Sequence, residues 1–105
     1  MLAPEPAAAH AVVVASEPAV DAVLHGQLVR IQLRFNSRID QERSRLTLIE
    51  ANGRSTPVTL DPSQGPDTLS AILDRLTPGR YRLRWQVLAI DGHITHGDIP
   101  FELAP

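Results

Sequence analysis

Two stretches of strict two-residue alternation constrain the fold of this chain more than any other feature. Between residues 28 and 35, apolar side chains at every second position are separated by arginine and glutamine. Between residues 80 and 87, tyrosine, leucine, tryptophan and valine alternate with arginine and glutamine in the same way. Because successive side chains of a β-strand point to opposite faces, each stretch predicts a strand with one buried face.

Weaker strand patterns and the turn signals between them predict an all-β fold. The further expected strands cover residues 11–16, 45–50, 56–60, 68–72 and 94–103. Asn52-Gly53 predicts a tight hairpin, because both residues tolerate positive φ. Residues 40–45 could form one helical turn, and residues 69–76 fit either a helix or a strand. About seven short strands indicate a Greek-key β-sandwich or barrel.

Length and composition limit the number of domains and the classes of function. A chain of 105 residues is close to the commonest size of a single domain. The absence of cysteine excludes disulfides, thiolate nucleophiles and zinc-thiolate sites. The formal net charge of -2 and the aromatic content of 4% argue against a nucleic-acid partner. No apolar run approaches the roughly 18 residues of a membrane-spanning helix.

The first residues permit two interpretations. Three alanines, Ala7, Ala8 and Ala9, directly precede His10, which is the small-residue pattern at the end of a secretory signal. Residues 1–9 are therefore either the remnant of a leader or a flexible Pro/Ala tail. In both cases residues 10–105 are expected to form a single domain.

A turn with metal-binding potential joins the last two predicted strands. Asp91 and His93 flank Gly92, and a carboxylate beside an imidazole suits Cu(II), Ni(II) or Zn(II). His10 precedes the first strand and could reach the same end of a sandwich as a further ligand. If the chain were cut after Ala9, the α-amine and imidazole of His10 would complete three nitrogens and one oxygen, a set that suits Cu(II). The alternative is that Asp-Gly forms only a turn and His10 only a tail.

A long motif near the C-terminus surrounds the turn that contains Asp91 and His93. It consists of Leu76, Pro78, Gly79, Tyr81, Leu83, Trp85, Val87, Asp91, Gly92, His93, Gly97, Phe101 and Leu103. The start of the domain adds His10-Ala11, a Ser16-x-Pro18-Ala19 segment and Asn36-Ser37-Arg38-Ile39 after the strand at residues 29–35. Together these segments resemble the signature of the CopC family of periplasmic copper-binding proteins.

The resemblance implies a sandwich of cupredoxin-like or immunoglobulin-like topology that binds copper without catalysis. Cu(II) would be held by the amine and imidazole of His10, by Asp91 and by His93. A methionine-rich Cu(I) site is not expected, because Met1 is the only methionine. The family role would be a monomeric copper carrier or buffer in the bacterial periplasm, serving copper homeostasis or resistance. It would pass copper to a copper-transporting membrane protein or another periplasmic acceptor.

Two further histidines are weaker candidates for metal ligands. His96 follows His93 by three positions, so on an extended strand it points to the opposite face and is expected to be a surface imidazole. Its alternative role is an auxiliary group that contacts a ligand. His25 lies in a predicted loop, where it would be structural or at most a minor metal contact.

Two other functions compete with copper transport. One is a metal-free immunoglobulin-like interaction module, in which the Asp-Gly-His segment is only a turn. The other is a copper-dependent monooxygenase, which is disfavoured because an aspartate ligand would fill the coordination plane and no row of exposed aromatic residues is evident.

All ten basic residues are arginines, and several share the alternating stretches. Arg80, Arg82 and Arg84, joined by Arg30 and Arg34, could form one basic sheet face. Such a face is usually a solvated surface that resists aggregation. The functional alternative is docking to an acidic partner or an anionic lipid.

Overall fold

Eight β-strands make up the part of the chain described by this computed structural model, residues 11–62 and 65–105. No helix occurs in those two ranges, so they contain no helical segment that could cross a membrane. The strands are β1 (Val13–Glu17), β2 (Ala22–Leu24), β3 (Val29–Phe35), β4 (Arg45–Glu50), β5 (Ser55–Val58), β6 (Thr68–Leu73), β7 (Gly79–Leu88) and β8 (Ile94–Leu103).

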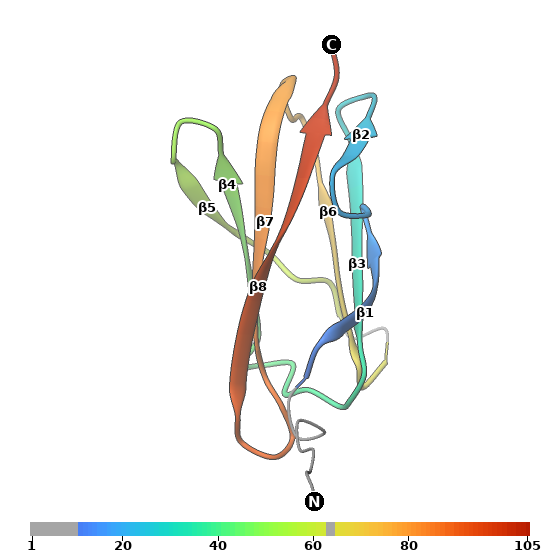
Figure 1. The fold of residues 1–105 in the computed structure, drawn as a ribbon, viewed down its shortest axis with the longest axis vertical. Coiled ribbons are helices and arrows are strands. Elements are labelled where there is room, and N and C mark those ends of the chain that lie inside the picture. The colour runs from blue at the N-terminus through green and yellow to red at the C-terminus, as the bar shows by residue number, and fades with distance from the viewer. Residues whose placement is uncertain (1–10, 63–64) are drawn as a thin grey trace, which may run out of the picture.

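The strands form two sheets that face each other, as Figure 1 shows. One sheet has three strands in the order β1-β3-β6, and the other has five in the order β2-β8-β7-β4-β5. β1 and β2 follow each other along one side of the sandwich but belong to different sheets. β1 pairs with β3, and after residues 18–21 the chain continues as β2 beside the end of β8. This arrangement confirms the predicted all-β sandwich.

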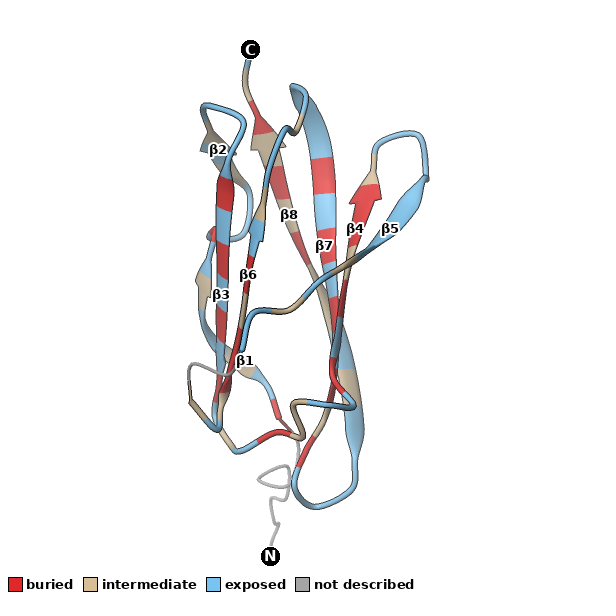
Figure 2. Ribbon diagram, turned by 180° about the vertical axis from the view of Figure 1, so that it is seen from behind, coloured by how far each residue is buried: buried red, intermediate tan, exposed pale blue. Residues whose placement is uncertain are grey.

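The core fills the space between the two sheets. Buried residues alternate with exposed ones along β3 and β7, as the predicted strands require (Figure 2). Phe35 of one sheet and Trp85 of the other meet edge to face, with ring centroids 5.2 Å apart. Tyr81 stacks on Phe101 at 5.4 Å. The prediction that Trp85 and Tyr81 are core residues is confirmed, because they are only 8% and 6% exposed.

Three local features differ from the sequence interpretation or resolve it. The ambiguous segment after residue 68 is the strand β6. Residues 41–43 form a turn rather than a helix, in which the side chain of Asp40 accepts a hydrogen bond from the Arg43 backbone at 3.1 Å. β2 was not predicted, because three residues are too few to show an alternating pattern.

The arginines of β3 and β7 do not form the single basic face that the sequence allows. Arg30 and Arg34 lie at exposed positions of β3, on the outer side of the three-stranded sheet. The arginines of β7 lie on the outer side of the five-stranded sheet, which is the opposite surface of the sandwich. Alternation within a strand identifies its exposed face but does not say to which sheet the strand belongs.

Candidate metal centre

The turn between β7 and β8 is built around Gly92. This residue has φ +92°, a left-handed backbone conformation that glycine adopts without a steric penalty. The Gly92 amide donates to the Ala89 carbonyl at 2.9 Å, and the Ala89 amide donates to the His93 carbonyl at 2.8 Å. These bonds close a short loop at the end of the two longest strands. The residues on either side of Gly92 are thereby fixed in space.

Asp91 and His93 contact each other across this glycine. The backbone amide of His93 donates to Asp91 Oδ1 at 3.0 Å, and Asp91 Oδ2 lies 3.0 Å from His93 Nδ1. The carboxylate side chain is 28% exposed and the imidazole 58%. The turn therefore presents one oxygen donor and one nitrogen donor, close together and accessible from solvent.

A neighbouring segment supports the turn from the side. The Asp40 amide donates to the Leu88 carbonyl at 2.8 Å, and the Ile90 amide donates to the Arg38 carbonyl at 3.2 Å. Between them, Ile39 is only 6% exposed and belongs to the core. The β7 side of the turn is thus attached by hydrogen bonds to a segment that is anchored in the core.

The described chain begins at the same end of the sandwich as this turn (Figure 1). Ala11 is fully buried, and its carbonyl accepts a hydrogen bond of 2.8 Å from the hydroxyl of Thr95 on β8. Thr95 follows His93 by two positions. Ala11 is therefore fixed beside the first residues of β8.

The predicted third ligand, His10, lies outside the described residues. Within residues 11–62 and 65–105, no group of three or more histidine, cysteine, aspartate or glutamate side chains is arranged to hold a metal ion. The described part of the site therefore supplies two donors, Asp91 and His93. Two donors alone bind a divalent ion weakly, so a tight site requires a further ligand.

His96 lies on the outer face of the five-stranded sheet. It is exposed and stands opposite Gln86 of β7. The buried positions of β8 are Ile99, Phe101 and Leu103, so His96 belongs to the alternate, outward-facing set. It does not join Asp91 and His93.

His25 lies at the other end of the molecule. It directly follows β2, whose last residue, Leu24, pairs with Leu103 at the end of β8. The turn with Asp91 precedes the first residue of the same ten-residue strand. A strand rises about 3.3 Å per residue, so roughly 30 Å separates His25 from the turn. His25 therefore supplies no ligand to the turn of its own molecule.

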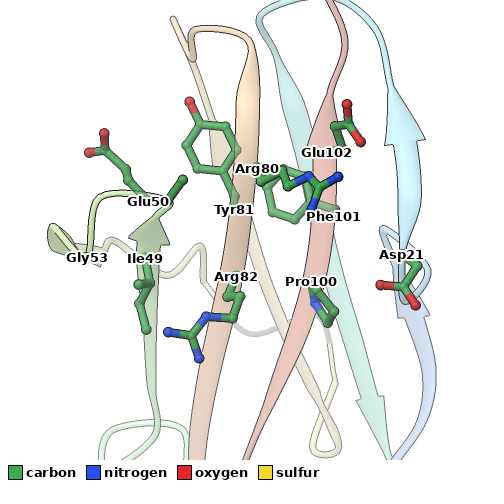
Figure 3. Close-up of a pocket in the computed structure, with 11 residues that line it drawn as sticks. Asp21, Ile49, Glu50, Gly53, Arg80, Tyr81, Arg82, Pro100, Phe101 and Glu102 are labelled. Atoms are coloured by element: carbon green, nitrogen blue, oxygen red, sulfur yellow. The ribbon is translucent and has the colours of Figure 1, made fainter.

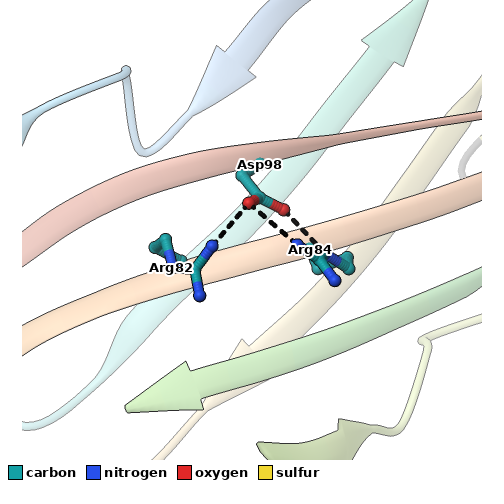
Figure 4. Close-up of polar contacts among 3 residues, drawn as sticks. All are labelled: Arg82, Arg84 and Asp98. Atoms are coloured by element: carbon teal, nitrogen blue, oxygen red, sulfur yellow. Dashed lines mark hydrogen bonds and ion pairs between the residues drawn. The ribbon is translucent and has the colours of Figure 1, made fainter. Parts of the chain in front are cut away.

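An ion-pair cluster that the sequence analysis does not identify lies on the outer face of the five-stranded sheet, midway along β7 and β8. Asp98 of β8 accepts hydrogen bonds from Arg82 at 2.8 Å and from Arg84 at 2.9 and 3.2 Å (Figure 4). The hydrogen bond from Arg84 is the main reason why the pKa of Asp98 lies below its ordinary value. The same contact raises the pKa of Arg84. Asp98 stands opposite Arg84 in the β7–β8 register, so correct pairing of the two strands would have revealed the contact.

A groove open to solvent lies on the same outer face, at the end away from the turn. Its volume is about 550 Å³, and Figure 3 shows the residues that line it. Its lining includes the cations Arg80 and Arg82, the anions Glu50 and Glu102, and the apolar side chain of Ile49. None of the predicted metal ligands among the described residues lines it. Its mixed charges favour no particular class of ligand.

Comparisons with known proteins place these features in a family. The family model described as the CopC domain matches residues 13–104. CopC from Methylosinus trichosporium OB3b is 23% identical, covers 91% of this chain and 95% of its own, and superposes with a TM-score of 0.81. PcoC from Escherichia coli, described as a methionine-rich copper resistance protein, is 25% identical, with coverages of 90% and 99% and a TM-score of 0.72. No curated protein matches the sequence significantly.

A more distant structural match shows how general the architecture is. The structure of murine CRIg is 14% identical, with coverages of 90% and 97% and a TM-score of 0.51. At this identity the likeness concerns the fold alone. The fold by itself therefore does not separate a metal-binding protein from other sandwich domains.

Proposed function

This chain belongs to the CopC domain family, and we propose that it binds Cu(II) and acts as a copper carrier or buffer in the bacterial periplasm, without catalysing a reaction. The observation that supports this function best is the contact between Asp91 and His93 at an accessible turn. One structural relative, PcoC, is itself described as a copper resistance protein. The family, the motif and the donor pair thus favour the same role.

The distance between the two donors fits coordination of a single ion. Donor atoms of histidine and carboxylate lie about 2.0–2.1 Å from a divalent first-row metal. Two such donors at a right angle are about 2.9 Å apart. Asp91 Oδ2 and His93 Nδ1 are separated by 3.0 Å. The separation is therefore that of neighbouring positions on one ion, and an ion bound there would replace the direct contact between Nδ1 and Oδ2.

The third ligand in this proposal is His10. Ala11 is held beside β8 through its carbonyl, and consecutive Cα atoms are about 3.8 Å apart, so His10 starts from a fixed point near the turn. Its imidazole adds a second nitrogen donor. Where the chain starts at His10, the α-amine adds another, which gives the nitrogen-rich set that Cu(II) prefers.

The ligand chemistry favours Cu(II) over Cu(I). Cu(I) is selected by soft sulfur ligands. PcoC is described as methionine rich, whereas this sequence contains one methionine and no cysteine. The nitrogen and oxygen donors proposed here are harder ligands. We therefore expect a single Cu(II) site and no second site of the thioether type.

The proposed cellular role is transfer of copper rather than its use. An exported form, with residues 1–9 removed as a leader, would take up Cu(II) and pass it to a copper-transporting membrane protein or another periplasmic acceptor. The intact mass of protein recovered from the periplasm tests the location and the first residue together. Recovery of the protein only from the cytoplasm would refute the location.

Cu(II) titration of the full chain by competition with a chromophoric chelator tests the site. The wild type should bind one equivalent without oxygen- or peroxide-dependent turnover. His93→Ala should weaken binding on the order of 100-fold, since even groups that only support a metal ligand commonly account for 10- to 100-fold in affinity. Asp91→Asn should also weaken binding. Its amide oxygen can still accept the His93 backbone bond, so the turn is retained while the charged donor is lost.

Two other histidines provide matched controls. His96→Ala removes an imidazole from the outer face, and His25→Ala removes one from the far end of the molecule. Both variants should bind Cu(II) as the wild type does. Unchanged affinity in His93→Ala and Asp91→Asn, or an equal loss in the control variants, would contradict the proposed site.

A further inference from the structure

We propose that Thr95 and Asn36 are positioning residues for the copper site: their side chains fix Ala11 and Val12, and thereby keep the imidazole of residue 10 near Asp91 and His93. We call these two side chains the N-terminal clamp. The inference rests on the proposed function, since it assigns the clamp a role only if residue 10 is a ligand. Neither clamp residue is itself a proposed ligand.

Thr95 provides the first contact of the clamp. Its hydroxyl donates to the Ala11 carbonyl at 2.8 Å and joins residues that are 84 positions apart in sequence. Thr95 belongs to the same strand as the turn and lies two residues beyond His93. It therefore couples the start of the domain directly to the element that carries two of the proposed ligands.

Asn36 provides the second contact, from the opposite sheet. Its side-chain oxygen accepts a hydrogen bond from the Val12 amide at 2.9 Å, and its own amide donates to the Val12 carbonyl at 3.0 Å. Val12 precedes β1, where the ladder with β3 is interrupted by a register shift between Val13 and Ala15. The side chain of Asn36 therefore holds the chain at the point where regular strand pairing is lost.

The burial of Ala11 explains why a clamp is effective here. Ala11 is fully buried and packs with the core, so its backbone has one defined position when its hydrogen bond is made. A methyl side chain alone provides little contact area to enforce that position. Removing the Thr95 hydroxyl would leave the carbonyl without this partner and would favour release of the segment.

Fixing residues 11 and 12 raises the effective concentration of residue 10 at the turn. A ligand attached to an anchored segment binds in an intramolecular step, whereas a released segment must first be ordered. If only a fraction of molecules has the segment in place, the apparent affinity falls by that fraction. The clamp therefore contributes to copper affinity without touching the metal.

The test uses Cu(II) titration and electron paramagnetic resonance of the full chain. Thr95→Val replaces the hydroxyl by a methyl group of similar size and should weaken Cu(II) binding about tenfold, the effect of one lost hydrogen bond. At saturation its spectrum should keep the nitrogen couplings that His10→Ala removes, because the clamp changes the fraction of molecules ready to bind and not the ligand set. Thr95→Ser, which keeps the hydroxyl, should restore the affinity. Thr56→Val, at an exposed position of β5, is the control and should behave as the wild type.

A double-mutant cycle separates positioning from a general loss of stability. If the clamp acts through residue 10, Thr95→Val should have no further effect on affinity in the His10→Ala background. An equal loss in both backgrounds, or a wild-type affinity for Thr95→Val, would overturn the inference. If Thr95→Val does not fold, Asn36→Ala replaces it in the cycle and Asn36→Asp, which keeps the acceptor, replaces the serine variant. A wild type that fails to bind Cu(II) would refute the proposed function itself, which is a different result.

Discussion

At the residue scale, Asp91 makes two contacts with His93, and they have different consequences. Oδ1 accepts the backbone bond that shapes the turn, and Oδ2 faces the imidazole of His93. A substitution by alanine removes both contacts, so its effect on copper binding would combine loss of a donor with loss of local structure. A substitution by asparagine preserves the backbone bond. The asparagine variant is therefore the more informative probe of the metal.

The α-amine of His10 gives a prediction at the same scale. Protein that starts at His10 should bind Cu(II) about tenfold or more tightly than protein that starts at Met1, which corresponds to about 1.4 kcal/mol or more of additional binding free energy. In the longer form the same nitrogen is part of a peptide bond and is a poor ligand. Competition titration of the two forms measures the difference. Equal affinities would mean that the amine does not bind copper.

Some contacts of single residues can be predicted from the sequence, and others cannot. The glycine between Asp91 and His93 predicts a turn that places them close together, and the structure brings them into contact. Their role as metal ligands stays a prediction. Thr95 and Asn36 carried no such signal, because their partners are the backbone atoms of residues far away in the sequence. Side chains that act through backbone contacts of this kind require the fold before they can be recognised.

At the scale of elements, the pairing of β7 with β8 determines which residue lies against the ring of Trp85. The two strands pair over ten residues, and Trp85 stands opposite Gly97. A Cβ atom on residue 97 would lie 2.7 Å from Cζ2 of the Trp85 ring. The glycine therefore leaves space for the indole, which in turn packs against Phe35 of the other sheet.

This close approach predicts the effect of enlarging residue 97. Gly97→Ala should lower the free energy of unfolding by about 1–3 kcal/mol, the usual cost of overpacking a core. Urea denaturation measures the change. Trp85→Phe in the same background should recover part of the loss, because the smaller ring leaves room for the methyl group. Equal stability of Gly97→Ala and the wild type would show that the indole moves aside freely.

The ion pairs of Asp98 predict a pH dependence that belongs to the same pair of strands. The pKa of Asp98 is lowered in the folded state from an ordinary value of 3.8, mainly by Arg84. Its contribution to stability is therefore present above that value and is lost as the pH falls through the lower folded pKa. The difference in unfolding free energy between wild type and Asp98→Asn should be largest near neutral pH.

Urea denaturation at several pH values tests this expectation. The difference between the two proteins should shrink at pH values below about 4, where the carboxylate becomes protonated. Asp40, whose pKa is lowered by hydrogen bonds with Arg43, is present in both proteins, so its titration cancels in the comparison. A difference that stays constant from neutral to acidic pH would contradict the role of the charge.

Strand prediction worked where the pattern was long and failed where it was short. β3 alternates strictly over its seven residues and β7 over residues 80–87, and the alternation predicts both strands closely. β2 has three residues and pairs in parallel with the end of β8, an arrangement that is set by the path of the edge strand between the sheets. Local pattern contains no information about such a path.

The molecule as a whole has two different ends. One end carries the Asp91–His93 turn and the buried start of the described chain, and the other carries the C-terminus (Figure 1). The residues that line the mixed-charge groove lie toward this second end. The outer arginines divide between the two faces of the sandwich instead of forming one basic surface. The proposed chemistry is therefore confined to a single tip, and the sandwich serves as its rigid support.

The most direct test of the copper site is a crystal structure of the Cu(II)-loaded protein with anomalous scattering recorded at the copper edge. The account predicts one copper peak per chain at the β7–β8 turn, bound by the His93 imidazole, the Asp91 carboxylate and a nitrogen of His10. A peak beside His25 or His96, or a copper ion at the turn with residue 10 bound elsewhere, would contradict it.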